Sequence, residues 1–322
     1  MTTPVTQPAT ALGIDFGGTS VKFGVVQGHD VIDRAPAIAT EDFSEPQPLI
    51  DAILRIIENL RTRHPYISAI GVGVPGFVDF RAGIIHNLTN VPGWTNIPLR
   101  TILHQHTGLL VTVENDANCM AYAEWKGGAG KDMEHLVCIT LGTGVGGGVI
   151  THGHMLRGAH SLAGETGQTS IDYQGRKGAY GNLGALEDYI GNNEIAMDAH
   201  DFYLSKGIER SIKDCTPAAL SHAAADGDEI AKEMWHLIAA KLATTVINTC
   251  WLLNPEAIII GGGVAKAGNL LFDPLKQHIT AQLSPAFSKS LQILPAFFSN
   301  DAGIIGAASL SLGQAEKYAA FT

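Results

Sequence analysis

Short runs of Val, Ile and Leu, most of them ending at glycines or another turn signal, recur along the whole chain. Such a run is typical of a buried strand that leads into a tight turn. The pattern predicts strands at 11–16, 21–26, 67–74, 109–113, 136–141, 149–150 and 257–260.

Between these strands the apolar positions change to a helical period. Leu49, Ile53, Ile57 and Leu60 share one face of a predicted helix at 48–63. The same reasoning predicts helices at 98–107, 116–126, 228–253, 272–283 and 302–312. The polar run from Asp116 to Asn118 is expected to cap the helix that begins there.

Strands that alternate with helices predict an α/β fold. The strand, glycine turn and returning strand at 11–26 resemble those at 136–150, which predicts two similar α/β domains with a ligand between them. We expect the first domain to comprise 1–115 plus 301–322, and a larger second domain to comprise 116–300.

Composition narrows the function classes. The chain has 322 residues and a formal net charge of -10, which argues against a nucleic-acid partner and favours a small molecule. Its four cysteines lie far apart without metal or disulfide spacing, as expected for buried thiols in a reducing compartment. The N-terminus lacks the pattern of a signal peptide, and no apolar run looks long enough for a membrane span. We therefore expect a cytoplasmic protein without a membrane partner.

Two glycine turns are candidates for phosphate binding. In the first, Gly17, Gly18 and Thr19 follow Asp15, so that backbone N–H groups could face a phosphate while the carboxylate holds a hydrated magnesium ion. An ordinary hairpin turn is an equal alternative on the pattern alone. Lys22 could reach a phosphate or face solvent.

The second turn, predicted at 142–148, contains Gly142, Thr143 and Gly144. Because the chain returns as a strand and opens no helix, it is neither a P-loop nor a dinucleotide fingerprint. A third turn at 261–263 includes Gly262 and Gly263, which could face a nucleotide or only connect a strand to a helix.

Acidic residues supply the candidate chemistry. Asn115 and Asp116 lie where a strand ends and a helix begins, the usual place for active-site residues of open sheets. A carboxylate there can accept the proton of an attacking hydroxyl, although the local pattern alone favours a helix-capping role for Asp116. Glu165 and Glu187 are two further candidates, each of which could be a surface charge.

The joint order of these pieces resembles the ROK family, which comprises repressors, uncharacterised open reading frames and sugar kinases. Nine pieces match in family order: D-F-G-G-T at Asp15, G-V-P-G at Gly73, N-V-P-G-W at Asn90, E-N-D-A-N at Glu114, L-G-T-G-V-G-G-G at Leu141, G-E-T-G at Gly164, G-N-L-G-A-L-E at Gly181, I-G-G-G-V at Ile260 and D-A-G-I-I-G-A-A at Asp301. The resemblance covers about residues 12 to 312.

The resemblance implies two actin-like (ribonuclease H-like) ATPase domains, ATP with Mg²⁺, and phosphorylation of a hexose at its 6-hydroxyl. It implies Asp116 as the catalytic base and a homodimer or a dimer of dimers. The other implied site residues are Asn90, Asn115, Glu165 and Glu187 for the sugar, Gly17, Gly18, Thr19, Gly142, Thr143 and Gly144 for the phosphates, and Gly262 and Gly263 for the nucleoside.

The sequence departs from the family at its zinc site. Most members have one histidine and three cysteines at the positions that here hold Gln168, Gly178, Tyr180 and Ala185. None of these supplies the thiolate or imidazole that structural zinc needs, so no zinc is expected. We expect Tyr173, Tyr180 and Leu183 to pack the loop instead, and the Gln168 amide to bond the loop backbone or the sugar.

Three alternatives remain within this resemblance. Glucose is the first choice of substrate by family frequency, ahead of N-acetylglucosamine, N-acetylmannosamine and fructose. Repressor members carry a DNA-binding domain before the first turn, and only fourteen residues precede Asp15 here, so we expect an enzyme. A non-catalytic sugar-binding protein is the third alternative.

Overall fold

The computed structural model describes residues 9–88 and 93–319, with side chains up to residue 316. The chain forms two compact units, both of mixed α/β structure. The first comprises 1–131, 155–163 and 300–322, and the second comprises 132–154 and 164–299. The α/β prediction is confirmed.

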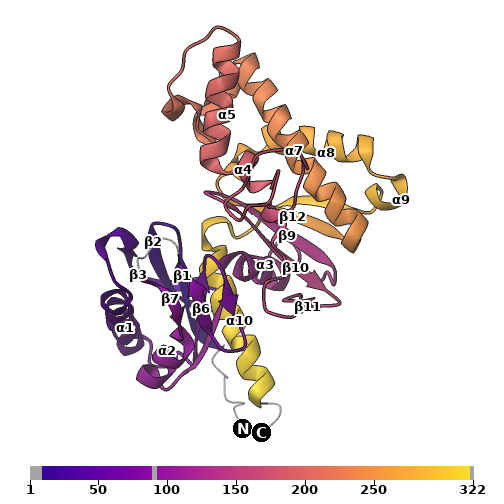
Figure 1. Ribbon diagram of the computed structural model, residues 1–322. Helices are drawn as coiled ribbons and strands as arrows, with labels where there is room; N and C mark the ends of the chain where they lie inside the picture. Colours follow the sequence, from indigo (N-terminus) through magenta and orange to yellow (C-terminus); the bar gives the residue numbers. More distant parts are fainter. Residues whose placement is uncertain (1–8, 89–92, 320–322) are drawn as a thin grey trace. The chain divides into compact units, whose positions relative to one another are not determined.

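The first unit is built on a five-stranded sheet in the order β3-β2-β1-β4-β8 (Figure 1). Strand β2 is antiparallel to β1, whereas β1, β4 and β8 are parallel. A small sheet β5-β6-β7 accompanies it. Its elements are β1 (Thr10–Phe16), β2 (Ser20–Gln27), β3 (Asp30–Ala39), α1 (Pro46–Arg63), β4 (Ala69–Val74), β5 (Val78–Asp79), β6 (Ile84–Asn87), β7 (Thr95–Ile97), α2 (Leu99–Thr107), β8 (Leu110–Asn115), α3 (Asp116–Gly127) and α10 (Ala302–Ala319), with short 3-10 turns at Thr40–Asp42 and Ser299–Asp301.

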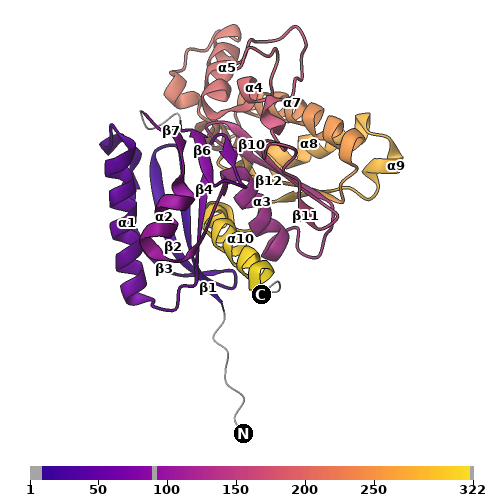
Figure 2. The ribbon, with the colours of Figure 1, turned by 60° about the horizontal axis from the view of Figure 1, so that its bottom comes forward.

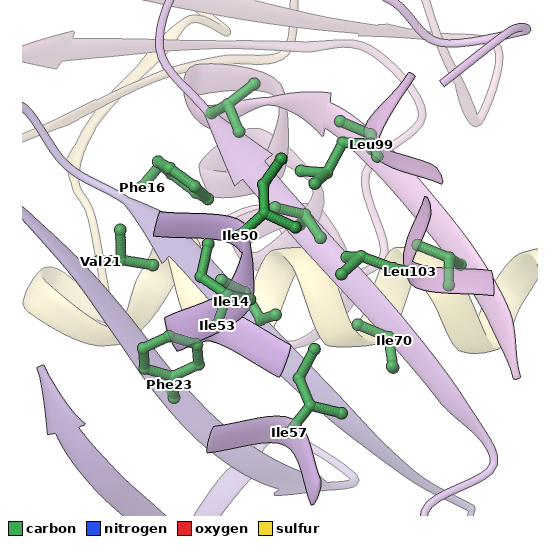
Figure 3. Packing of buried hydrophobic residues seen from close by; sticks show 14 of the residues in the cluster. Ile14, Phe16, Val21, Phe23, Ile50, Ile53, Ile57, Ile70, Leu99 and Leu103 are labelled. Atoms are coloured by element: carbon green, nitrogen blue, oxygen red, sulfur yellow. The ribbon is translucent and has the colours of Figure 1, made fainter. Parts of the chain in front are cut away.

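Alternation along β1 assigns its side chains to two faces of this sheet. Leu12, Ile14 and Phe16 join the core beneath α1 and α2, where Ile50, Ile53, Leu99 and their neighbours pack (Figure 3). Gly13 lies on the opposite face, where an added Cβ would lie 2.1 Å from the Ile304 carbonyl oxygen of α10. The glycine therefore lets α10 lie directly on the sheet.

The second unit repeats this topology in a sheet of order β11-β10-β9-β12-β13. Here too the second strand is antiparallel to the first, while β9, β12 and β13 are parallel. The predicted repeat thus extends from one hairpin to a whole sheet. The elements are β9 (Leu136–Leu141), β10 (Val145–Thr151), β11 (His154–Met155), α4 (Glu187–Ile190), α5 (Asn192–Ser205), α6 (Pro217–Ala225), α7 (Glu229–Leu253), β12 (Ala257–Gly261), α8 (Asn269–Gln282), α9 (Pro285–Ser288) and β13 (Gln292–Pro295), with 3-10 turns at Thr166–Gln168, Ile212–Cys215 and Val264–Ala267.

Helix α7 is long and apolar enough to cross a membrane by length and composition alone, which the sequence analysis did not expect. Half of its apolar window is buried inside the structure. It packs along α8, as Figure 2 also shows. Because the core helix of a soluble protein passes the same test, the signal is weak evidence for a membrane span.

Several elements were not predicted, among them β3, α5 and α6, and two further details differ from the prediction. The second glycine turn comprises only residues 142–144, because Gly146, Gly147 and Gly148 pair with β9 inside β10. Helix α3 belongs to the first unit, whereas the predicted boundary at 115 gave it to the second. The cause is its close packing on α10: a Cβ on Gly306 would lie 1.8 Å from the Cys119 carbonyl oxygen.

Candidate functional site

In the first unit, three adjacent strands bring the predicted acidic residues together at one edge. Asp15 of β1 is in register with Gly73 of β4, which is in register with Glu114 of β8. Asn115 and Asp116 follow Glu114 at the end of the same strand. The carboxyl ends of parallel strands meet here, where ligands of open α/β sheets bind.

The surroundings of Asp15 make its carboxylate a good partner for a cation. Its side chain is 16% exposed, and Lys22 Nζ lies 3.9 Å from Oδ2. Burial raises the pKa of the Asp15 carboxyl, and the charge of Lys22 opposes that rise only in part. A Cβ on Gly303, in the first turn of α10, would lie 2.6 Å from Asp15 Oδ1. Lys22 is exposed, as one of its two alternatives expected, and it also contacts Asp15.

The first glycine turn lies beside this carboxylate. The Gly17 N–H donates to the Ser20 carbonyl oxygen at 2.8 Å and closes the turn, while Gly18 and Thr19 are exposed. Thr40 donates its N–H to the Thr19 carbonyl oxygen at 3.0 Å. The backbone of the turn is thus held by these two hydrogen bonds, while Gly18 and Thr19 remain open to solvent.

Asn115, and not Asp116, caps α3. Its Oδ1 accepts from the N–H groups of Ala117 at 2.9 Å and Asn118 at 3.1 Å. Its Nδ2 donates to the Gly76 carbonyl oxygen at 3.2 Å. The predicted cap is therefore shifted by one residue, and Asp116, the first helical residue, accepts from the Ala117 N–H at 2.8 Å.

A buried ion pair that the sequence analysis missed supports this edge. Glu114 is 1% exposed, and its Oε2 accepts from Arg157 Nε at 2.7 Å. Its Oε1 accepts from the Asn115 N–H at 2.9 Å and from Asn118 Nδ2 at 3.1 Å. The pair fixes the strand end that carries Asn115 and Asp116. Arg157 lies in a separate segment 43 residues away, and no local pattern connects it with Glu114.

In the second unit, Glu187 lies directly on the second glycine turn. Its Oε2 accepts from the Val145 N–H at 2.8 Å, and its Oε1 accepts from Gln168 Nε2 at 3.2 Å. A Cβ on Gly144 would lie 2.4 Å from Oε2. A predicted sugar residue therefore supports a predicted phosphate turn.

Glu165 and Tyr180 complete this cluster. Burial, and then the negative charge of Glu187, raise the pKa of the Glu165 carboxyl. The Tyr180 side chain is mostly exposed, yet its partial burial raises its pKa as well, and the charges of Glu187 and Glu165 add to that rise. Carboxylates that are close and partly desolvated are acceptors suited to sugar hydroxyls.

The two glycines of the third turn differ in what requires them. Gly262 has a φ of +90°, and a Cβ there would lie 2.2 Å from the Leu141 carbonyl oxygen, so the fold itself needs this glycine. Gly263 has open space around its Cβ position. Nothing within the fold excludes a side chain at Gly263, and a ligand that approaches the backbone remains a reason for glycine there.

The loop at 169–186 does not provide a zinc site. The Gln168 amide is committed to Glu187 and to Asn182, whose Nδ2 donates to Gln168 Oε1 at 3.3 Å. A Cβ on Gly178 would lie 2.6 Å from Asp188 Oδ2, so a cysteine there would require the Asp188 side chain to shift. Among the described residues, no group of three or more His, Cys, Asp or Glu could hold a metal ion. The expectation of no zinc in the purified protein stays a prediction.

The predicted packing of this loop is wrong. Tyr173, Tyr180 and Leu183 are 79%, 64% and 45% exposed, so their burial cannot stabilise it. Asn90, the remaining predicted sugar residue, lies outside the described residues. All four cysteines are buried and free, as expected.

Comparison with known proteins shows to which family the chain is related. The model of the ROK family matches residues 11–314. The glucokinase of Thermotoga maritima is 33% identical over 310 residues, which cover 93% of this chain and 96% of the relative. The N-acetylmannosamine kinase of Escherichia coli is 29% identical over 305 residues, 95% of this chain and 99% of that one.

A solved structure of a ROK family glucokinase from Streptomyces griseus, in complex with glucose and AMPPNP, has a TM-score of 0.81. It is 29% identical and covers 95% of this chain and 100% of its own. The fold is accordingly the two-domain, actin-like ATPase fold that the sequence predicted. Matched along nearly its whole length, this chain belongs to the ROK family.

Proposed function

We propose that this protein is an ATP-dependent hexose kinase that transfers the γ-phosphoryl group of ATP to the 6-hydroxyl of a sugar. The observation that carries the proposal is the register of Asp15 and Glu114 across β1, β4 and β8, which brings Asp116 to the strand edge that holds the first glycine turn. A base and a phosphate turn at one edge suit phosphoryl transfer to a hydroxyl.

Each group then has a role. Asp116 would accept the proton of the attacking hydroxyl. The turns at 17–19 and 142–144 would hold phosphates through backbone N–H groups, with Gly262 and Gly263 near the nucleoside. Asp15 would hold Mg²⁺ through water, since a buried carboxylate with a raised pKa gains most from a cation. The ion supplies charge neutralisation at the phosphates.

The sugar would be bound by Glu165, Glu187 and Asn115, and by Asn90. Because the Gln168 amide donates to Glu187, we assign it to orienting that carboxylate. Glucose is the first choice of substrate, since the relative from Thermotoga maritima is a glucokinase. An N-acetylhexosamine is the alternative, since another relative phosphorylates N-acetylmannosamine by name. Assembly as a homodimer or a dimer of dimers, and a cytoplasmic location, belong to the same proposal.

A panel of sugars tests this function. Purified protein with ATP and Mg²⁺ is incubated with glucose, fructose, N-acetylglucosamine or N-acetylmannosamine, and ADP release is followed by a coupled assay. We expect one sugar to raise ADP release at least about tenfold over the sugar-free rate, because the sugar hydroxyl is the acceptor. Sugar binding without any increase in ADP release would instead indicate a non-catalytic sugar-binding protein.

A further inference from the structure

The loop at 169–186 has little regular structure of its own. Two isolated β-bridges, Ser170 with Ala185 and Lys177 with Leu183, are its only ladder contacts among the described residues. Tyr173, Tyr180 and Leu183 are exposed, and among its apolar side chains only Ala185 and Leu186, at its C-terminal end, are fully buried. Apolar burial therefore fixes that end of the loop but does not explain how the rest of it keeps one conformation.

Arg176 connects the loop directly to two helices, and to a third through Asp198. Its Nη1 donates to the Asp188 carbonyl oxygen of α4 at 2.8 Å, and its Nη2 donates to Asp198 Oδ1 of α5. Lys241 of α7 donates to the other oxygen of Asp198 at 2.8 Å. The Arg176 guanidinium also lies 4.6 Å from the centroid of the Tyr189 ring. We call Arg176, Asp198, Lys241 and Tyr189 the arginine clamp.

The backbone of Arg176 is fixed in the same place. Its N–H donates to the Tyr189 hydroxyl at 2.9 Å, and its carbonyl oxygen accepts from the Gly184 N–H at 2.6 Å. Gly184 in turn accepts from the Ile171 N–H at 2.8 Å. The parts of the loop that contain Ile171, Arg176 and Gly184 are therefore hydrogen-bonded to one another beside the arginine clamp.

A short series of hydrogen bonds leads from the loop to Glu187. Asn182 Nδ2 donates to the Gln168 backbone oxygen at 3.1 Å and to its side-chain Oε1 at 3.3 Å. Gln168 Nε2 then donates to Glu187 Oε1. If the loop moved at Arg176, Asn182 would move with it and its hydrogen bonds to Gln168 would be lost. Of the two hydrogen bonds to the Glu187 carboxylate, only the one from the Val145 N–H would then stay in place.

We propose that Arg176 is a positioning residue for sugar binding, which acts by clamping the loop so that Gln168 orients Glu187. A guanidinium suits this task because its planar fork donates in two directions while it stacks on an aromatic ring. The inference rests on the proposed function for its effect on sugar affinity. Its structural part, the order of the loop, is independent of that function.

The test compares Arg176→Met and Arg176→Lys with a matched control, Arg210→Met. Arg210 makes the same kind of contacts elsewhere in the unit: it donates to Asp228 at 2.7 Å and lies 4.0 Å from the Tyr203 ring centroid. For Arg176→Met we expect the sugar KM to rise about tenfold, the effect of one lost hydrogen bond, with kcat within about threefold of wild type. Arg176→Lys keeps the charge but not the fork, so we expect an intermediate KM. Arg210→Met should leave the sugar KM unchanged.

Hydrogen exchange provides a readout that needs no activity. The amides of Ile171, Gly178 and Gly184 are bonded within the loop, and we expect them to exchange faster in Arg176→Met but not in Arg210→Met. Unchanged exchange would overturn the proposal, and so would an equal effect of Arg210→Met. A raised KM with unchanged exchange would also overturn it, because Arg176 would then act without ordering the loop. If wild-type protein phosphorylates no sugar, the proposed function fails, and the exchange comparison still decides whether the clamp orders the loop.

Discussion

Asp116 is the residue on which the chemistry of the proposal depends. Asn115 is the cap of α3, and Asp116 also accepts from the Ala117 N–H of the first turn, so the test of proton acceptance needs a variant that keeps this acceptor oxygen. Asp116→Asn keeps the shape of the side chain but cannot accept a proton. We expect kcat to fall about 100- to 10,000-fold with sugar affinity within about threefold of wild type.

Steady-state kinetics and a separate titration of sugar binding check this prediction. Asp51→Asn is the matched control, since it makes the same chemical change at an exposed position of α1 and should leave kcat unchanged. An Asp116→Asn variant that retained a third of wild-type turnover would show that another group takes the proton.

We expect the ionised Asp15 carboxylate to lower the free energy of unfolding when no cation is bound to it. Its pKa is raised in the folded protein above the usual value of 3.8, so the folded state binds the proton more tightly than the unfolded state. Folding stability therefore falls as the pH rises from the unfolded-state pKa through the folded-state pKa. An asparagine at position 15 cannot ionise, so it does not cause this loss of folding stability.

We accordingly expect Asp15→Asn to melt at a higher temperature than wild type at pH 7.5 without nucleotide, by at least about 1 °C. The difference should narrow as the pH is lowered from 7.5 into the acid range and Asp15 takes up its proton. Thermal melts across this pH range measure it. A variant less stable than wild type at every pH would show that ionised Asp15 stabilises the fold.

At the scale of elements, the sequence predicts most strands and helices because apolar period and glycine are local signals. The prediction fails where a glycine is required by close packing and not by a turn. Gly147 reads as part of a turn but lies inside β10, where a Cβ would be 2.3 Å from the Gly164 carbonyl oxygen. Local sequence does not distinguish these two reasons for glycine.

Long-range pairs were equally unpredictable. Arg157 with Glu114 and Arg176 with Asp198 are 43 and 22 residues apart in sequence, and both join elements that only the fold brings together. By contrast, Asp15, Asn115 and Asp116 were identifiable because each follows or ends a strand at the edge where ligands bind. The positions proposed for function were therefore easier to find than the residues that support them.

The second glycine turn and Glu187 should act as one element. In Gly144→Ala, the new methyl group would occupy space 2.4 Å from Glu187 Oε2 and displace the carboxylate from the Val145 N–H. We expect sugar affinity to fall about tenfold, the effect of one lost hydrogen bond to a charged group. Isothermal titration with sugar measures it.

Gly142→Ala is the control for this experiment, because the nearest atom to its Cβ position is 3.9 Å away. We expect its sugar affinity to stay within about twofold of wild type, whatever happens to ATP. Equal losses in both variants would indicate that the turn, and not its contact with Glu187, determines sugar affinity.

At the scale of the whole molecule, the fold should not depend on zinc. The four positions of the family's zinc site hold Gln168, Gly178, Tyr180 and Ala185, none of which supplies a thiolate or an imidazole. We expect less than about a tenth of an equivalent of zinc per chain by elemental analysis. Activity should be complete after zinc-selective chelation with excess Mg²⁺ restored. Stoichiometric zinc, whose removal melts the protein, would contradict this.

The central claim is that the protein transfers phosphate from ATP to a sugar hydroxyl, and ³¹P nuclear magnetic resonance of the reaction tests it most directly. With ATP, Mg²⁺ and the preferred hexose, the account predicts a growing sugar 6-phosphate resonance, with one molecule formed for each ADP. Asp116→Asn should suppress that resonance by at least about 100-fold. Release of inorganic phosphate in place of the sugar phosphate, or no change in ATP with any sugar of the panel, would contradict the account.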